Sequence, residues 1–220
     1  PFLENKSLLT FKHLVLRTSG QDVFRTKFRD VLATCLMQDT GLDYQGYRQS
    51  VLYINGEYWG IYNIREKVNR YFIHYNHGIE DLETIDILEG NSRVKAGEAD
   101  HYLKMMDFIT RKDLSRQENY DYVKTVMDVQ SFMDYMIVQM YSANTDTGNV
   151  RMWRERTEGG KWRWMLYDLD LGFGSGATVT HDSVGFLINP AGTGAGGMFD
   201  TRLIRNLMKS PEFRSDFIKR

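Results

Sequence analysis

The 220-residue chain has one cysteine, almost no net charge and no long apolar run. Cys35 alone rules out an internal disulfide framework, although the compartment stays open because secreted bacterial domains often lack cystines as well. Lysine and arginine number 28 against 29 acidic residues, so no global positive field favours nucleic acid. No segment approaches the roughly 18 to 20 apolar residues that span a bilayer. These absences exclude nucleic acid and a membrane span as expected partners, so a local site must choose the ligand.

Several familiar site motifs are also missing. No Gly-x-Gly-x-x-Gly loop precedes the first expected strand, and no Gly-x-x-x-x-Gly-Lys-Ser/Thr occurs, which excludes a Walker-type nucleotide site. The Gly-x-Ser-x-Gly elbow of serine hydrolases is absent too. His74 and His77 are three residues apart, but no nearby Glu or Cys completes a zinc set, which favours two solvent-facing histidines.

What the chain does have is enough apolar content, 42%, to bury a core of one large domain or two small lobes. Residues 8–16 mix apolar side chains with single charges and predict a strand. Asp22 is a good helix N-cap, and apolar residues follow it at spacings of three and four until near Gly41. We therefore expect a helix here, with one stripe formed by Phe24, Phe28, Val31, Leu32 and Cys35.

A tight hairpin comes next. Asn55-Gly56 tolerates the positive backbone angles of a two-residue turn, and it lies between two strand-like runs at 51–54 and 58–62. The remainder is predicted to be mainly helical. The expected elements are a short helix within 65–78, a short strand at 86–88, a polar loop at 89–98, helices around 102–109 and 132–140, a long glycine-rich loop at 172–197, and a helical end at 199–217 with Pro211 as a break or helix start.

The most informative stretch is an apolar strand that stops abruptly in two carboxylates. In extended backbone, Trp162, Trp164 and Leu166 share one side with Asp168, and Asp170 follows if the extended geometry persists. A second polar cluster lies 22 positions upstream of Asp168, where an apolar helical segment gives way to Asn144, Asp146 and Asn149. Carboxylate and amide oxygens of this kind, with phosphate oxygens, are what Mg²⁺ prefers.

A purely structural interpretation competes with this one. The three upstream residues could make side-chain turns to their own backbone, and the two aspartates could cap the segment that follows them. Any one of these residues, considered alone, is more often structural than functional. Together, and joined to the preceding strand, they favour a site.

Several motifs in chain order resemble those of the spore coat protein H (CotH) kinase family. The resemblance covers most of the chain, although Asn149 lies three rather than four positions after Asp146, a partial match to Asn-x-Asp-x-x-x-Asn. The matching strings are Asn55-Gly56-Glu57-Tyr58-Trp59-Gly60-Ile61-Tyr62, Arg65-Glu66-Lys67, Asn144-Thr145-Asp146, Tyr167-Asp168-Leu169-Asp170-Leu171-Gly172-Phe173-Gly174, and the closing segment with Pro211-Glu212-Phe213-Arg214.

The resemblance implies an atypical protein kinase that uses ATP with Mg²⁺ or Mn²⁺. Asp146 would be the catalytic aspartate, which faces the acceptor hydroxyl. Asp168 would be the main metal carboxylate, comparable to that of an Asp-Phe-Gly motif, with Asn149 as a second metal ligand and Asp170 as the alternate. Metal ions neutralise phosphoryl charge in such chemistry, while the aspartate orients the nucleophile.

A kinase also needs a cation on the phosphates and a surface for the base. Arg17, at the end of the first strand, is our candidate cation, with Arg25, Lys27 and Arg65 as competitors. Glu66 follows the hairpin, where a connection between lobes would meet adenine. For each of these residues a solvated charge or a surface ion pair is the structural alternative.

We therefore expect an α+β, two-lobed kinase-like fold, truncated at its N-terminal side, with a sheet-containing part at about 1–66 and a mainly helical part at about 67–220. The expected function is phosphoryl transfer from ATP to a protein hydroxyl, in the spore coat, cell surface or secreted setting that the resemblance implies.

Two alternatives to a kinase stay open. One is a non-catalytic scaffold that binds a protein or glycan, for which the four tryptophans and thirteen tyrosines could form a platform. Trp59, Trp162 and Trp164 lie on expected strands, however, where aromatic residues more often pack in a core. The other alternative is a metal-dependent phosphoesterase built on the same carboxylates.

Overall fold

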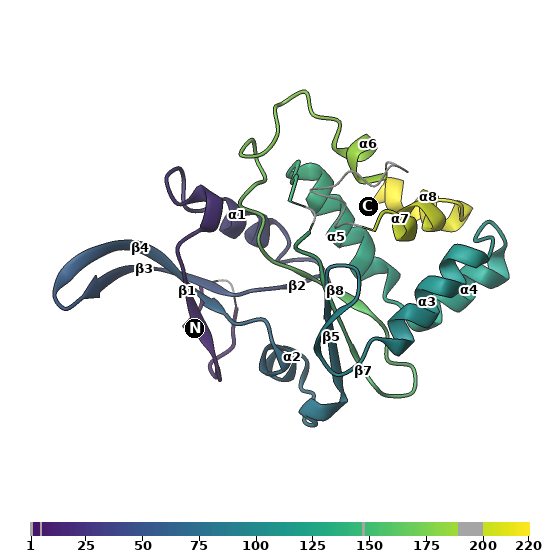
Figure 1. Cartoon of the computed structure of the whole chain (residues 1–220), viewed down its shortest axis with the longest axis horizontal. Helices are drawn as coiled ribbons and strands as arrows, with labels where there is room; N and C mark the ends of the chain where they lie inside the picture. Colours follow the sequence, from purple (N-terminus) through teal and green to yellow (C-terminus); the bar gives the residue numbers. More distant parts are fainter. Residues whose placement is uncertain (1, 5, 147, 189–199) are drawn as a thin grey trace.

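The computed structural model describes residues 2–4, 6–146, 148–188 and 200–220 and has an α+β fold with two sheets (Figure 1). An antiparallel three-stranded sheet has the order β1-β4-β3, and a five-stranded sheet has the order β2-β8-β7-β5-β6. In the second sheet β2 runs parallel to β8, and the other pairs are antiparallel. The strands are β1 (Leu14–Arg17), β2 (Asp43–Tyr44), β3 (Tyr47–Ile54), β4 (Glu57–Glu66), β5 (Ile85–Glu89), β6 (Arg93–Ala96), β7 (Arg151–Glu155) and β8 (Arg163–Leu166).

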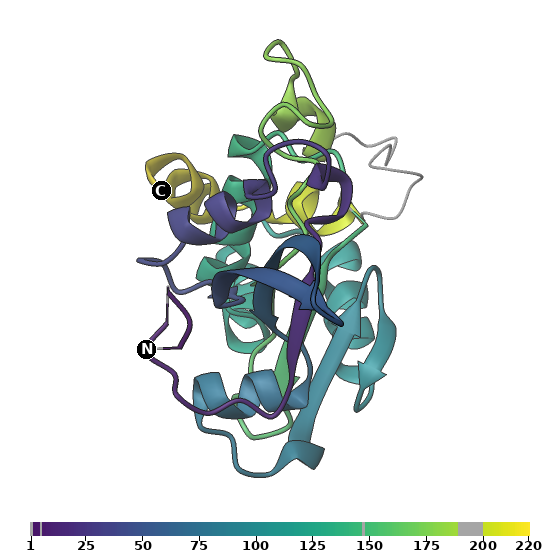
Figure 2. The same ribbon diagram turned by 90° about the vertical axis from the view of Figure 1, so that its left-hand side faces the viewer.

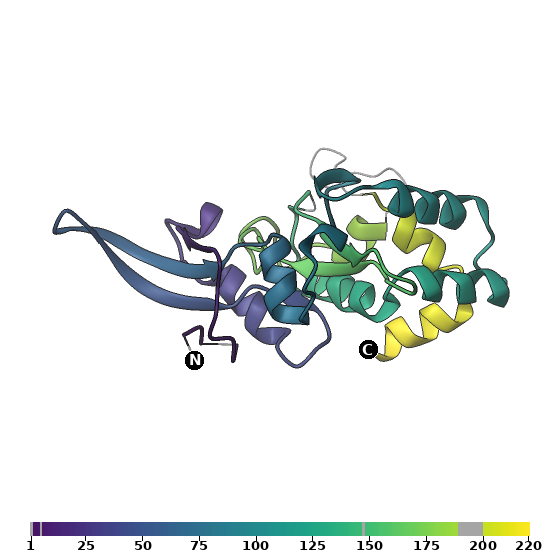
Figure 3. The same ribbon diagram turned by 90° about the horizontal axis from the view of Figure 1, so that it is seen from below.

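The predicted hairpin is confirmed and forms a long arm. Asn55 and Gly56 join β3 to β4 with φ of 54° and 84°, as a tight turn requires. Because β1 pairs only with 63–66 of β4, the rest of the two-stranded ribbon projects from the body (Figures 1 and 3). Tyr53, Tyr58 and Trp59 on this arm are 56–60% exposed, so the expectation that Trp59 packs in a core is wrong.

The first helix is shorter than its apolar periodicity predicts. α1 spans Arg29–Leu36, and Asp22 belongs instead to a short 3₁₀ turn, η1 (Gly20–Asp22). The Asp22 carboxylate accepts hydrogen bonds from the backbone of Thr26 and Phe28, which organises a loop ahead of α1. Phe24 is 96% exposed on that loop. The polar side chain therefore satisfies loop amides rather than a helix end, and the apolar stripe loses its first members.

The remaining helices surround the five-stranded sheet, and α1 and α2 lie on opposite sides of the three-stranded sheet (Figure 2). Pro211 starts α8, one of the two roles that the sequence predicts for it, and Ser210 is the N-cap. Asn69 caps α2 by accepting from the backbone of Tyr71 and Phe72. The helices after α1 are α2 (Arg70–His77), α3 (Asp100–Arg111), α4 (Gln117–Val126), α5 (Val129–Tyr141), α6 (Ser183–Ile188), α7 (Arg202–Leu207) and α8 (Pro211–Lys219), and the 3₁₀ turn η2 (Leu82–Thr84) precedes β5.

The central strands of the five-stranded sheet, β5, β7 and β8, bury side chains on both faces. Along β8, Trp164 and Leu166 join the main core, whereas Met165 faces a smaller cluster under α2. This alternation follows from the two-residue repeat of a strand. The sheet holds the end of β8 rigidly and thereby positions the acidic segment that follows it.

Two expectations about loops are corrected. The polar segment 89–98 contains β6, which pairs with β5 through residues 93–96. The glycine-rich segment 172–197 contains α6, whose Leu187 is buried, while its residues 189–197 lie outside the described residues. In addition, β2 lies within 1–66 but pairs with β8, so the five-stranded sheet draws on both predicted parts.

Among the described residues, no helix has the length and hydropathy that crossing a membrane requires.

A histidine beside this core gives a pH-dependent stability. His101 Nδ1 accepts a hydrogen bond of 3.0 Å from the buried Trp162 indole, and burial, with the charge of Arg154, lowers its pKa below 6.5. The unfolded chain then binds the proton more readily than the folded one, so acidification from about pH 7.5 to about pH 5.5 destabilises the fold. We expect a steeper fall of Tm across this range for the wild type than for His101→Gln, measured by thermal melting. His13→Gln, at an exposed histidine, is the control and should retain the wild-type slope.

Candidate active site

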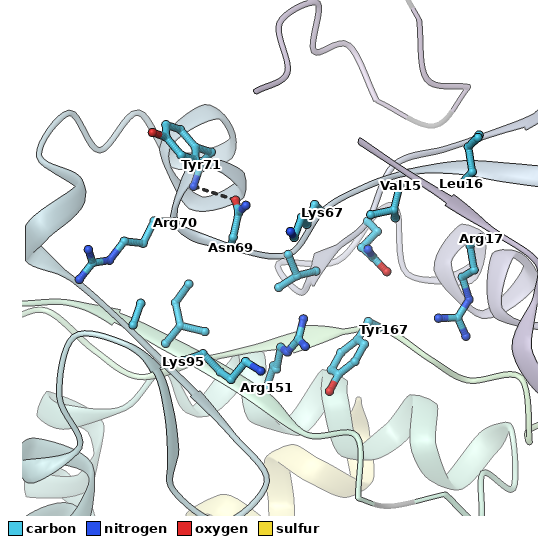
Figure 4. A pocket seen from close by; sticks show the side chains of 14 residues that line it. Val15, Leu16, Arg17, Lys67, Asn69, Arg70, Tyr71, Lys95, Arg151 and Tyr167 are labelled. Atoms are coloured by element: carbon cyan, nitrogen blue, oxygen red, sulfur yellow. Dashed lines mark hydrogen bonds between the residues drawn. The ribbon is translucent and has the colours of Figure 1, made fainter. Parts of the chain in front are cut away.

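A pocket of about 860 Å³ lies between the two sheets (Figure 4). Val15 and Arg17 of β1 line one side, and the connection from β4 to α2 lines it through Lys67, Val68 and Asn69. The other side is lined by the five-stranded sheet and by Tyr167, which follows β8. The pocket therefore combines apolar walls with a polar end at Arg17, next to the acidic segment.

The loop after α5 is built by asparagine turns. Asn144 is buried; its Oδ1 accepts from the backbone of Asp146 at 3.2 Å, and its Nδ2 donates to Gln139 Oε1 at 2.8 Å. The structural interpretation therefore holds for Asn144. It holds in part for Asp146, whose carboxylate accepts from the backbone of Gly148, whereas the side chain of Asn149 reaches Asp168 outside the loop.

Asp146, Asn149 and Asp168 meet at one point. Asn149 Nδ2 donates to Asp146 Oδ2 at 2.8 Å and to Asp168 Oδ2 at 2.9 Å. The two aspartates are 22 positions apart in the chain and come from the ends of α5 and β8. The predicted convergence of the two acidic clusters is thus found in the fold.

The same aspartate forms an ion pair with Arg17, which lines the pocket. Arg17 Nη2 donates to Asp168 Oδ1 and, at 3.3 Å, to Asp170 Oδ2. Asp168 has a φ of 63°, so the backbone turns at this residue and the extended geometry does not persist to Asp170. Both carboxylates nevertheless reach the same guanidinium, because Asp170 returns towards β1 after the turn.

The carboxylates of the site differ in burial and therefore in pKa or accessibility. Asp170 is fully buried and accepts from the backbone of Gln21 at 2.9 Å, and its burial, with the charge of Asp168, raises its pKa to about 6. Burial and the charge of Asp168 also raise the pKa of Asp146 above its ordinary value. Asp168 retains partial exposure of its side chain, 23%, which makes it the more accessible of the two strand-end carboxylates.

Glu66 does not fit the role expected for it. Its carboxylate is buried away from the pocket and accepts from Gly46 at 2.6 Å and from Asn76 at 2.9 Å, with Lys6 at 2.8 Å as its ion-pair partner. Glu66 is not among the residues that line the pocket. The connection between the sheets does border the pocket, as the sequence predicts, but it does so through Lys67, Val68 and Asn69. The Glu66 carboxylate instead binds Lys6, Gly46 and Asn76.

Of the competing cations, Arg65 is buried against Asp30 of α1 at 2.5 Å, and Arg25 reaches Ser175 on the surface. Asp30 is a site residue that sequence reasoning missed. Its other oxygen accepts from the backbone of Leu169 at 2.9 Å, so this one carboxylate joins α1 to the acidic segment. The available signal was an aspartate within the apolar stripe of a helix, a position where a charge must find a partner.

Backbone strain also gathers at the site. Of the six non-glycine residues with positive φ among those described, Ser19, Ala143, Asp168 and Phe173 lie in the loops around the two clusters. Such strain persists only where the surrounding structure holds it and is typical of functional sites.

Gly20 lets the η1 turn approach Asp170. Its φ is 49°, and a β-carbon there would overlap Asp170 Oδ2. We expect Gly20→Ala to lower the free energy of unfolding by about 3 kcal/mol, from strain and overlap together. Gly56→Ala, with a φ of 84° but open space around it, should cost only about 1 kcal/mol. Chemical denaturation of both variants measures the difference, and equal losses would mean that the overlap relaxes freely.

The donor set is suited to a hard cation that a ligand helps to bind. Among the described residues, no group of three or more His, Cys, Asp or Glu side chains is arranged to hold a metal ion alone. Asp168 and Asn149 supply oxygen ligands only, and rotation of the Asn149 amide would present its oxygen where its nitrogen now bridges the two carboxylates. One or two carboxylate or amide oxygens plus phosphates is the usual protein contribution to a Mg²⁺ site.

Comparison with known proteins identifies the family of the chain. No curated protein matches the chain. The family model described as CotH kinase protein matches residues 3–220, which is essentially the whole chain and includes every residue of the site. The chain therefore belongs to the CotH kinase protein family.

Proposed function

We propose that the protein transfers the γ-phosphoryl group of ATP to a protein hydroxyl, with Mg²⁺ or Mn²⁺ as the metal. The observation that carries the proposal is the meeting of Asp146, Asn149 and Asp168 next to Arg17, the residue that forms the polar end of the pocket. Family membership supports a kinase-like protein, and the pocket has apolar walls for a base next to an acidic, metal-compatible end.

Each residue has a role that its position supports. Asp168 and Asn149 hold the metal, which neutralises charge on the phosphates, and buried Asp170 is the less accessible alternate. Asp146 orients the acceptor hydroxyl and accepts its proton. Arg17 contacts the phosphate end while its guanidinium restrains Asp168 and Asp170. The base lies at the end of the pocket away from Arg17, beside Asn69 of the connection that Lys67 begins and Tyr71 of α2 (Figure 4).

The proposal is tested by thermal melting with ATP and Mg²⁺ together. A ligand that binds only the folded state adds about 2.7 kcal/mol of stability at a concentration of about 100 times its Kd. We expect a clear rise in Tm with ATP and Mg²⁺, a much smaller one with ATP and a chelator, and label transfer from γ-labelled ATP to a hydroxyl-bearing protein. No metal-dependent rise would overturn the proposal, and release of free phosphate without a labelled acceptor would favour the phosphoesterase.

A second candidate is a non-catalytic scaffold that binds a protein or glycan. It is favoured by the projecting β3–β4 arm, whose exposed Tyr53, Tyr58 and Trp59 offer an aromatic surface. Partner binding that survives loss of ATP binding but is lost in Trp59→Ala would support this candidate.

A further inference from the structure

The positive charge of Arg17 is already balanced. Its guanidinium contacts Asp168 and Asp170, and its Nε lies 4.0 Å from Asp30. Arg65 shares Asp30, so three carboxylates surround two guanidinium groups. Asp146 adds a fourth carboxylate beside Asp168, so a divalent metal ion would offset the excess of two negative charges but leave no net positive charge for the phosphate chain. The cations that attract a polyphosphate must therefore include others.

Three further cations line the middle of the pocket. Lys67 comes from the β4–α2 connection, Lys95 from β6 and Arg151 from β7 (Figure 4). No Asp or Glu is found among the described residues that line the pocket. Lys95 and Arg151 share one carboxylate, that of Glu89, at 3.6 Å and 2.7 Å. Within the described part of the chain, Lys67 has no carboxylate within ion-pair distance. Three cations against one carboxylate leave two positive charges in excess.

These cations are next to the acidic end. The Arg151 guanidinium lies over the Tyr167 ring at 4.4 Å, and Tyr167 directly precedes Asp168. Arg70 also lines the pocket, but its guanidinium is held by Glu83 at 2.9 Å and by the carbonyl of Ile85. The excess charge is therefore concentrated between the base-binding walls and the acidic cluster, where a phosphate chain would pass.

We propose that Lys67 and Lys95 bind the nucleotide phosphates from opposite sides of the pocket, with Arg151 between them and Tyr167. This inference rests on the proposed function; it gives a role to Lys67, which the sequence analysis quoted only within the Arg65-Glu66-Lys67 string, and adds Lys95 and Arg151. An ammonium group is a compact charge on a flexible stem, suited to following a phosphate chain, whereas Arg151 is fixed by its two partners. Because Lys67 belongs to the side of the first sheet and Lys95 to the second sheet, phosphate also links the two sheets across the pocket (Figure 4).

The test compares nucleotides that differ only in phosphate number. Calorimetric titration with ATP, ADP and AMP, each with Mg²⁺, is applied to the wild type, Lys67→Gln, Lys95→Gln and the double variant. Each single change should weaken ATP binding by about tenfold, since a charge-assisted hydrogen bond is lost, and the double change should weaken it by about 50-fold or more. The loss should shrink through ADP and be within about threefold for AMP, because fewer phosphates reach the lysines.

Arg93→Gln is the matched control. Arg93 pairs with the same Glu89 but does not line the pocket, so its removal changes the local charge equally and should change ATP affinity by less than about twofold. Equal losses for ATP and AMP, or an equal effect of Arg93→Gln and Lys95→Gln, would overturn the inference while leaving the proposed function in place. A wild type without magnesium-dependent ATP affinity would overturn the proposed function and this inference together.

Discussion

Asparagine in place of Asp168 is expected to abolish metal-dependent ATP binding and to lower phosphoryl transfer by about 10³-fold or more. Asp168 is the partly exposed carboxylate at the point where Asn149 and Arg17 converge, and it is more accessible to a metal than the buried Asp170. An amide keeps the shape but loses the negative charge that holds the cation and, through it, the triphosphate. Titration with ATP at saturating Mg²⁺, together with steady-state transfer kinetics, measures both effects.

Asp168→Asn removes the charge without adding backbone strain, because asparagine tolerates the backbone conformation at this position. The φ of 63° is in the left-handed region, where Asn and Asp are favoured over other non-glycine residues, so Asp168→Ala would confuse strain with loss of charge. Asp107→Asn, which removes an exposed carboxylate from an i,i+4 pair on α3, is the control and should retain wild-type binding. Equal ATP affinity in the wild type and in Asp168→Asn would refute the assignment of this residue to the metal.

Asp146→Asn should show the opposite pattern, with transfer slowed by about 10² to 10⁴-fold and ATP affinity changed by less than about threefold. The Asp146 carboxylate accepts from Asn149 but has no contact with Arg17, so it is placed for the acceptor rather than for the nucleotide. In the variant, the amide oxygen of the new side chain can still accept the hydrogen bond from Asn149, which preserves the loop.

The pH dependence gives a second readout for Asp146. Burial and the charge of Asp168 raise its pKa, and only the ionised form accepts a proton, so the rate should rise with pH through this raised pKa. The rising limb should disappear in Asp146→Asn. If Asp146→Asn weakens ATP binding as strongly as Asp168→Asn does, the division of roles between the two aspartates is wrong.

The pair of results separates the candidate functions. A scaffold that only retains the shape would bind its partner equally well in both variants. A phosphoesterase would lose activity in both but would release free phosphate in the wild type. Only a kinase would lose nucleotide binding in Asp168→Asn and, in Asp146→Asn, retain nucleotide binding while transferring phosphate to protein slowly.

Local signals in the sequence predicted local structure well. The Asn55-Gly56 turn and the helix start at Pro211 were confirmed because these residues restrict the backbone within a few positions. The N-cap expected at Asp22 failed because the same carboxylate found loop amides instead, and α1 began at Arg29. β6 was missed because the polar-apolar alternation of Arg93-Val94-Lys95-Ala96 covers only four residues, mostly exposed, within a polar segment.

By itself, the sequence determined the α+β class, the order of the acidic clusters and the family resemblance that whole-chain matching confirmed. It could not determine which charges meet. Arg17 and Asp168 are 151 positions apart, Glu66 is taken by Lys6, and Lys67 and Lys95 come to one pocket from different sheets. Ion pairing depends on distance in space, with an energy that falls as charges separate, and only the packing of the two sheets sets those distances.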